Sequence, residues 1–262
     1  MKISICCPSY KRPIVKTLKY LPFTKVYVDG SEFDVYKEEN PNAEIIKCKD
    51  GVQGNVARVR NYILETEFES GADAVCILDD DIRRLERFVL NKETNYGYER
   101  EEIIDQEFMP MLEKYTLLCE EWGFKLWGVN LNIDNLSYRH CVPFSTTSVI
   151  LGPFSVHLKN PIRYDLRLPL KEDYDLCIQH LNKYRGILRV NSIHYDCLQS
   201  ENKGGCATMR NMKREKYNTV QKQKVIETIK NFNRSFTAKD LKKELDKTDK
   251  IGLTTIYREL EE

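Results

Sequence analysis

The amino-acid sequence predicts an α/β protein with a largely parallel sheet and helices on both faces, followed by a small helical module. Three observations predict it. Short apolar runs alternate with segments of helical period over the first half of the chain. Acidic residues follow two of those runs, where strands should end. From about Asn218 onward cysteine and proline disappear and the pattern is helical, so we expect a domain boundary near Tyr217.

Each expected element carries a local signal. The expected strands are short apolar runs, several of them closed by proline, glycine or charged residues: 3–7, 26–28, 44–48, 74–78, 126–130, 148–151 and 187–193. The expected helices have apolar residues near a period of 3.6: 52–68, 100–122, 173–184, 220–232, 237–245 and 253–262. Thr237 with Asp240 three residues later fits a helix start. We therefore expect a first domain over residues 1–217 and a three-helix module over residues 218–262.

Composition and charge exclude several classes of protein. The 262 residues include 41 Lys or Arg and 40 Asp or Glu, so a general polyanion-coating role is not expected. No run approaches the ~18 apolar residues of a membrane span. The apolar N-terminus is short and is broken by Pro8, so no signal peptide is expected. Nine cysteines without a Cys-x-x-Cys pair favour reduced thiols and a cytoplasmic location.

The triplet Asp79-Asp80-Asp81 follows the expected strand 74–78 and is the strongest chemical signal in the chain. Ligands of parallel sheets bind beyond the carboxyl ends of the strands, so Asp29, after another strand, should face the same crevice. Carboxylates are hard ligands for Mg²⁺ or Mn²⁺, and such a cation stabilises a departing diphosphate. A solvated acidic turn or a helix N-terminus is the alternative for the triplet alone.

Two arginines, Arg58 and Arg60, lie on the expected helix before the triplet. Arginine offers fixed donors for phosphate and carboxylate, so both are candidates for donor binding. A solvated helix face is the alternative for either residue alone.

Four segments in this order resemble the nucleotide-binding half of GT-A glycosyltransferases: PSYKRP after the first strand, Asp29 after the second, ARVRN on a helix, and CILDDDI. The resemblance implies a GT-A (Rossmann-like) fold for the first domain, with a nucleotide-sugar donor. The donor-binding residues that we expect are Pro8, Tyr10, Asp29, Arg58, Arg60, Asp79 and Asp80. Within this set the resemblance implies that Pro8 and Tyr10 line the base pocket and that Asp79 holds the ribose. It also implies that Asp81 holds the metal ion.

The segment LPLKEDYDL places Glu172 and Asp173 just before an amphipathic helix. GT-A enzymes carry an acidic pair there, and in inverting members one carboxylate is the general base for the acceptor hydroxyl. We therefore expect Asp173 to be the base and Glu172 to support it; helix capping by two acids is the alternative. The resemblance also makes His194 a candidate metal ligand; a hydrogen-bonded structural histidine is the alternative. Cys177-x-x-His180 and His194-x-x-Cys197 leave a zinc site as another reading.

Beyond the GT-A pattern, the series KEDYDL, LNKYR and SENKGG resembles the TET-associated glycosyltransferases, which occur with base-oxidising dioxygenases in phage-like genomes. The resemblance covers residues 1 to about 217. It implies a hydroxymethylated pyrimidine in DNA as acceptor and a nucleotide sugar, such as a UDP-sugar, as donor. It also implies that Lys203, Gly204 and Gly205 form a loop near the diphosphate, where glycine lets the backbone approach oxygen.

The tail resembles the first part of the winged helix of ferric uptake regulators, at TAKDL and at IGLTTIYREL. The resemblance implies that Thr254, Thr255, Tyr257 and Arg258 face DNA on a recognition helix. Because the expected helix reaches the last residue of the sequence, we do not expect the β wing or the dimerisation domain of that family. Residues 218–262 hold ten Lys or Arg and eight Asp or Glu, so their attraction to phosphate should be weak. A small three-helix packing module is the alternative.

The sequence therefore predicts a metal-dependent, inverting glycosyltransferase that modifies hydroxymethylpyrimidine DNA. One alternative is a glycosyltransferase whose acceptor is a protein or a glycan. The other is a DNA-binding regulator whose α/β part senses a nucleotide without catalysis. The dense acidic cluster argues against a sensor, because a sensor needs no general base.

Overall fold

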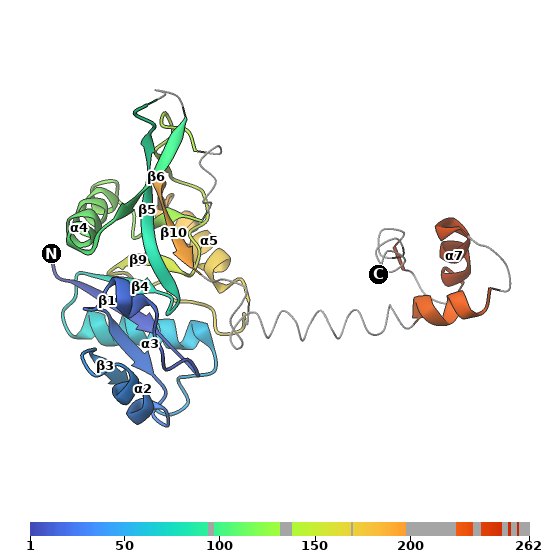
Figure 1. The fold of residues 1–262 in the computed structure, drawn as a ribbon, viewed down its shortest axis with the longest axis horizontal. Coiled ribbons are helices and arrows are strands. Elements are labelled where there is room, and N and C mark those ends of the chain that lie inside the picture. The colour runs from blue at the N-terminus through green and yellow to red at the C-terminus, as the bar shows by residue number, and fades with distance from the viewer. Residues whose placement is uncertain are drawn as a thin grey trace. The chain divides into compact units, whose positions relative to one another are not determined.

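The computed structural model describes residues 1–93, 97–131, 138–168, 170–197, 224–232, 237–247, 251–252 and 256. The chain divides into two compact units, Met1–Glu201 and Asn202–Glu262 (Figure 1). The expected domain boundary near Tyr217 lies outside the described residues. Among the helices that the structure describes, none has the length and apolar character needed to cross a membrane.

The first unit is built on one mixed sheet, with ten strands among the described residues. The strands are β1 (Ile3–Pro8), β2 (Lys25–Val28), β3 (Ile45–Lys47), β4 (Ala74–Leu78), β5 (Ile82–Leu90), β6 (Tyr98–Ile103), β7 (Leu126–Asn130), β8 (Phe144–Ser145), β9 (Phe154–Leu158) and β10 (Leu188–Cys197). Their order is β3-β2-β1-β4-β9-β7-β10-β5-β6, and β8 pairs with β10.

The N-terminal half of the sheet is parallel, as predicted. Strand β1 pairs in parallel with both β2 and β4, and β2 pairs in parallel with β3. Every residue of β4 is buried, as expected for a parallel strand covered on both faces. The order β3-β2-β1-β4 reverses direction at β1, so the topological switch point, where α/β sheets bind ligands, lies at the carboxyl ends of β1 and β4.

Helices cover both faces of the sheet, as predicted (Figure 1). They are α1 (Thr17–Tyr20), α2 (Phe33–Glu39), α3 (Val56–Glu69), α4 (Asp105–Glu121) and α5 (Glu172–Tyr184). Successive residues of a strand point to opposite faces: Ile5 packs in the cluster that contains α4, and Cys6 in the cluster that contains α3 and α5.

The second half of the sheet is where the structure departs from the sequence expectations. Strand β9 is antiparallel to β4 and β7, and β5 is antiparallel to β6 and β10, whereas β7 and β10 are parallel. The helix expected at 100–122 begins only at Asp105, because residues 98–103 pair with β5 and this pairing overrides their Glu-rich helical composition. The strand expected at 148–151 is irregular, and the strand β9 begins at Phe154, after Gly152 and Pro153.

In the second unit the described residues include part of the predicted helical pattern. Residues 224–230 are helical, and α7 spans Ala238–Leu245. Thr237 caps α7 and forms the predicted capping box with Asp240. The buried side chains of this unit are Val225, Leu241, Leu245, Ile251 and Ile256.

Candidate functional site

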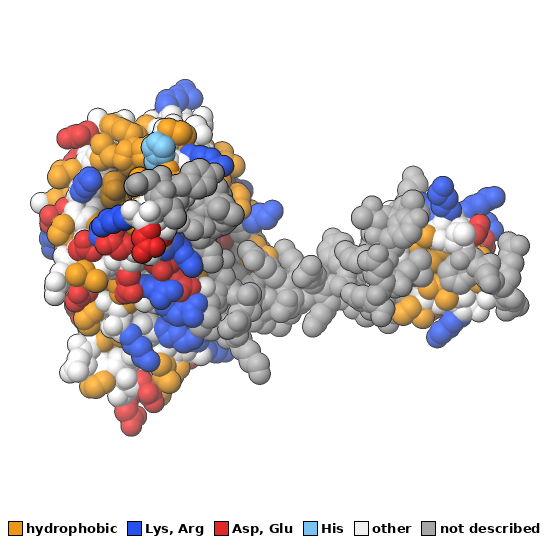
Figure 2. All heavy atoms as spheres, turned by 45° about the horizontal axis from the view of Figure 1, so that its top comes forward, with side chains coloured by type: hydrophobic (Ala, Val, Ile, Leu, Met, Phe, Trp, Pro, Cys, Tyr) orange, Lys and Arg blue, Asp and Glu red, His pale blue; other side chains and the backbone are white. Residues whose placement is uncertain are grey.

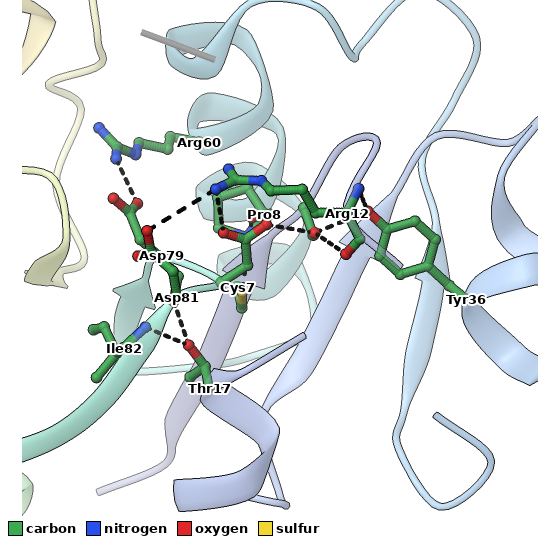
Figure 3. Close-up of polar contacts among 11 residues, drawn as sticks. Cys7, Pro8, Arg12, Thr17, Tyr36, Arg60, Asp79, Asp81 and Ile82 are labelled. Carbon is green, nitrogen blue, oxygen red and sulfur yellow. Dashed lines mark hydrogen bonds and ion pairs between the residues drawn. The ribbon is translucent and has the colours of Figure 1, made fainter. Parts of the chain in front are cut away.

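The acidic triplet lies at the switch point of the sheet. Asp79, Asp80 and Asp81 follow β4 directly, and the segment from Ser9 to Arg12 follows the neighbouring strand β1. The two strands are in register from Ile3 with Ala74 to Cys6 with Ile77, so both chain segments leave the sheet at the same edge. In Figure 3, Arg60 and Arg12 reach the triplet from different sides.

Asp80 is the buried member of the triplet, with 3% of its surface exposed. Its Oδ2 accepts a hydrogen bond from Ser9 Oγ at 2.6 Å, and its Oδ1 lies 3.0 Å from Arg12 Nη1. Burial raises the pKa of Asp80 to about 6, although Arg12 and Ser9 favour the charged form. Both carboxylate oxygens of Asp80 therefore hold the loop that follows β1.

The loop after β1 is also fixed through its backbone. Arg12 N donates to the hydroxyl of Tyr36 at 3.0 Å, and that hydroxyl lies 2.9 Å from Ser9 Oγ. Thr17 Oγ1 donates to the carbonyl of Asp79 and accepts from Ile82 N. The loop and the triplet thus form one hydrogen-bonded unit (Figure 3).

Asp79 faces a different partner. Its Oδ1 lies 3.0 Å from Nη2 of Arg60, and Nη1 of the same guanidinium lies 3.0 Å from Glu172 Oε1. The arginine is 3% exposed and also lies over the ring of Tyr164, with 5.6 Å to the ring centroid. Burial raises the pKa of Glu172, and the neighbouring Arg60 opposes that shift. Arg60 therefore joins the end of β4 to the start of α5, and it has little exposed surface for a phosphate.

The turn before β9, at Gly152 and Pro153, makes backbone hydrogen bonds to both Asp79 and Asp173. Gly152 N donates to Asp173 Oδ2 at 3.2 Å, and Pro153 O accepts from Asp79 N at 3.1 Å. A Cβ on Gly152 would come within 2.5 Å of the Arg60 guanidinium, so a larger residue would have to displace a group that is held by two ion pairs. The turn thus fixes the spacing between Asp79 and Asp173.

The alternative of simple helix capping accounts for the acidic pair only in part. Lys171 is the N-cap residue of α5 and makes no side-chain cap hydrogen bond. Glu172 points to Arg60, and Asp173 shares its carboxylate between Gly152 N and Tyr174 N. Unlike Glu172, which is 5% exposed, Asp173 is partly exposed, so it is the member of the pair that solvent can reach.

The other predicted donor-binding residues lie around this edge of the sheet without joining the cluster. Pro8 is the last residue of β1, and Tyr10 is 37% exposed with Lys11 Nζ 5.0 Å from its ring centroid. Asp29 follows β2 and accepts two hydrogen bonds from Ser31, which lower its pKa. Arg58 is exposed and bonds the carbonyl of Gly51, so the structure does not bring it to the triplet.

His194 is not brought to Asp81. It is fully buried on β10 opposite Glu86, which lies five residues after Asp81 along β5, and its Nε2 is 3.6 Å from Glu86 Oε2. Burial lowers its pKa, and its ring lies 4.9 Å from that of Phe88. Among the described residues neither ring nitrogen of His194 has a hydrogen-bond partner, so the site does not match the alternative of a hydrogen-bonded structural histidine, and the role of His194 stays a prediction.

The zinc alternative finds no support in the geometry. Cys177 and His180 make local contacts to the carbonyls of Ile150 and Leu176. Within the described part of the chain, no three His, Cys, Asp or Glu residues are grouped so that they could hold a metal ion.

A metal ion at Asp81 is still compatible with this donor set. Mg²⁺ commonly takes one or two protein carboxylates and completes its shell with water and substrate phosphate. Asp81 and Asp79 supply hard carboxylate oxygens at the ligand-binding edge of the sheet. A metal that enters together with a diphosphate would not need a third protein ligand.

Several predicted residues lie outside the described residues. They are Lys203, Gly204 and Gly205 of the proposed diphosphate loop and Thr254, Thr255, Tyr257 and Arg258 of the proposed recognition helix. Their roles remain predictions.

The sequence reasoning missed Arg12, Ser9 and Gly152. Ser9 and Arg12 lie within the PSYKRP segment, so their place after the first strand was the available signal. Gly152 gave no such signal, because its role depends on a contact with Arg60, which lies 92 residues earlier in the chain.

Residues 19–205 match the family model described as TET-Associated Glycosyltransferase, which is more than half of the chain. Comparison with the curated proteins found no significant match.

Among solved structures, the chain is similar to TarS of S. aureus in complex with UDP, at 15% identity and a TM-score of 0.43. That match covers 74% of this chain and 59% of the solved TarS chain (residues 1–349), so this chain spans less than two thirds of that structure. A197 from STIV matches at 13% identity and a TM-score of 0.39, over 76% of this chain and 86% of that one. A structure described as a nucleotide-diphospho-sugar transferase from Desulfovibrio desulfuricans G20 matches at 9% identity and a TM-score of 0.41, over 73% and 80%. Similarity this low says nothing about substrate or site residues.

The family match over most of an α/β domain makes this protein a glycosyltransferase. More particularly, the chain belongs to the TET-associated glycosyltransferase family.

Proposed function

We propose that this glycosyltransferase transfers a sugar from a UDP-sugar to the hydroxyl of a 5-hydroxymethylpyrimidine in DNA, with inversion and with the help of Mg²⁺ or Mn²⁺. The association of the family with TET enzymes supports a modified DNA base as acceptor. The observation that carries the chemistry is the connection between Asp79 and Asp173. Arg60 and the Gly152 turn hold these two carboxylates in one hydrogen-bonded unit at the switch point.

In this proposal each carboxylate has a separate task. Asp173 is the partly exposed acid, and it takes the proton from the acceptor hydroxyl as the new C–O bond forms. Glu172 is buried against Arg60, so it positions that arginine and the start of α5. Asp79 lies on the donor side of Arg60 with part of its side chain exposed.

The acceptor oxygen displaces the nucleoside diphosphate from the anomeric carbon in a single step, so the configuration there inverts. Asp81 is the residue that would hold the divalent cation, which supplies positive charge to the departing diphosphate. The acceptor base must be single-stranded or turned out of the duplex to reach Asp173.

The test is mass spectrometry of nucleosides from DNA that contains hydroxymethylcytosine or hydroxymethyluracil, after incubation with the full chain, Mn²⁺ and a panel of UDP-sugars. We expect a hexose-sized mass increase on the modified nucleoside. Asp173→Asn should lower the rate by about 10²–10⁴-fold, the usual contribution of a general base. Asp175→Asn is the matched control, because it removes an acid from the same first turn of α5 and its carboxylate accepts a hydrogen bond from Gln179.

Transfer of labelled sugar to protein, with none to DNA, would identify the alternative acceptor and overturn the proposal. Equal activity of Asp173→Asn and Asp175→Asn would show that Asp173 is not the general base. Full activity in excess chelator would show that the reaction needs no metal ion.

A further inference from the structure

Arg12 is a half-exposed arginine whose charged group lies on two carboxylates of the triplet. Its Nη1 is 3.0 Å from Asp80 Oδ1 and 4.0 Å from Asp81 Oδ2. The side chain of Arg12 is 32% exposed, whereas those of Asp80 and Asp81 are 2% and 11% exposed. The guanidinium therefore covers the acidic pair from the solvent side.

The backbone of Arg12 is fixed more firmly than its head group. The backbone N donates to Tyr36, and the carbonyl accepts from Ser9 Oγ at 3.3 Å. Among the described residues, the buried Nε of Arg12 has no hydrogen-bond partner. The side chain is therefore anchored at its base, while its head is held by the charges of Asp80 and Asp81.

A divalent cation on Asp81 and the guanidinium of Arg12 would compete for the same negative charge. A guanidinium nitrogen of Arg12 already lies 4.0 Å from the Asp81 carboxylate. A cation bound to that carboxylate would therefore lie close to the positive guanidinium, and the two positive charges would repel each other strongly in a partly buried site. Figure 2 shows acidic side chains gathered next to basic ones on one face of this unit. At the triplet, Arg12 itself partly neutralises the charge of Asp80 and Asp81.

We propose that Arg12 is a resident counter-ion that a divalent cation must displace from Asp81, and that the displaced guanidinium turns to the diphosphate of the donor. Arginine suits the second task because its planar donors match phosphate oxygens. The inference rests on the proposed metal role of Asp81. It implies that metal and nucleotide bind cooperatively, because each favours the same position of Arg12.

The test measures Mn²⁺ binding to the full chain by electron paramagnetic resonance, with and without UDP. Without nucleotide, Arg12→Gln should bind Mn²⁺ about tenfold more tightly than the wild type, which corresponds to about 1.4 kcal/mol. Arg12→Lys keeps the charge and should stay close to the wild type. Arg87→Gln is the control, since Arg87 also bridges two carboxylates but on Glu101 and Glu107. UDP should tighten Mn²⁺ binding more in the wild type than in Arg12→Gln.

A second measurement uses the wild type alone and does not depend on a variant that folds. Phenylglyoxal modifies accessible arginines, and peptide mass spectrometry reports the rate at each site. Mg²⁺ should raise the rate at Arg12 and leave the rate at Arg87 unchanged. An unchanged rate at Arg12 under saturating Mg²⁺ would overturn the displacement.

Asp81→Asn separates failure of this inference from failure of the proposed metal site. If Asp81→Asn abolishes Mn²⁺ binding while Arg12→Gln binds like the wild type, only the role of Arg12 is overturned. If Asp81→Asn binds Mn²⁺ like the wild type, or if the wild type with UDP binds none, the proposed metal role of Asp81 is overturned as well.

Discussion

Arg60 and Arg12 bind carboxylates of the same aspartate triplet, but their surroundings differ. The side chain of Arg60 is 4% exposed and lies between Asp79 and Glu172, whereas that of Arg12 is 32% exposed and lies over Asp80 and Asp81. Loss of one partner of a buried ion pair strongly destabilises the folded protein, because the other charge stays buried, whereas loss of one partner of an exposed pair changes the stability little. The comparison teaches that one side of the site is a fixed joint between distant segments, while the other side is open to rearrangement.

Arg60→Gln should have the largest effect on stability, because it removes the ion pairs that join Asp79 to Glu172. Glu172 would remain buried without its counter-ion, so we expect the free energy of unfolding to fall by about 3–5 kcal/mol, measured by urea denaturation. Arg12→Gln should cost less, because the side chain of Arg12 is 32% exposed and Ser9 Oγ still donates to Asp80 after the guanidinium is lost. Equal losses for the two variants would contradict the distinction between the two sides.

Gly152→Ala should disturb the fixed side from the turn. The new Cβ would lie 2.5 Å from the guanidinium of Arg60, and we expect a loss of about 2–3 kcal/mol in the free energy of unfolding together with a large drop in sugar transfer. Gly128→Ala is the matched control. Its Cβ would meet Ile150 and the carbonyl of Phe154 in the core, away from the carboxylates.

Both glycine variants should therefore lose stability, but only Gly152→Ala should change the pH dependence of transfer, since Gly152 N bonds the carboxylate of Asp173. Identical pH–rate profiles for Gly152→Ala and the wild type would mean that the turn is only structural.

Asp80→Asn tests the side of the site that Arg12 covers. It should have the smallest effect on the free energy of unfolding, and it should raise that free energy rather than lower it. The pKa of Asp80 is raised from 3.8 to about 6, so the folded protein holds this proton more tightly than the unfolded chain. Stability linked to Asp80 is therefore present below about pH 4 and is lost as the pH rises to about 6. The uncharged variant avoids that loss, and after allowance for its weaker contact with Arg12 we expect it to be about 1–2 kcal/mol more stable at pH 7.

Thermal melting at pH 4, 5, 6 and 7 measures this difference. The difference in melting temperature between Asp80→Asn and the wild type should become smaller as the pH falls from 6 to 4. A variant that is less stable than the wild type at every pH would show that Arg12 and Ser9 outweigh the cost of burying the charge.

Much of the parallel half of the fold was predictable from sequence. Its strands are short apolar runs, and its connections are local, so the expected strands 3–7, 26–28 and 74–78 are confirmed nearly residue for residue. The antiparallel half was harder. Strand β5 alternates buried and exposed residues irregularly, and β6 is rich in glutamate, so only pairing between them reveals the strands.

The candidate site divides in the same way. The positions of Asp79, Asp81 and Asp173 followed from strand and helix ends, which are local features. The inward turn of Asp80 did not follow, and neither did the distance of His194 from Asp81, because both depend on register between strands far apart in the chain.

The sequence by itself determined where strands and helices end and therefore which acidic groups meet at the switch point of the sheet. The tertiary structure alone decided which of those groups are engaged and which are accessible. Neighbouring carboxylates look alike in a sequence. Only the partners that folding brings from β1, α3 and the Gly152 turn make Asp80 an anchor of the loop after β1, make Glu172 a buried ion-pair partner, and leave Asp173 partly exposed.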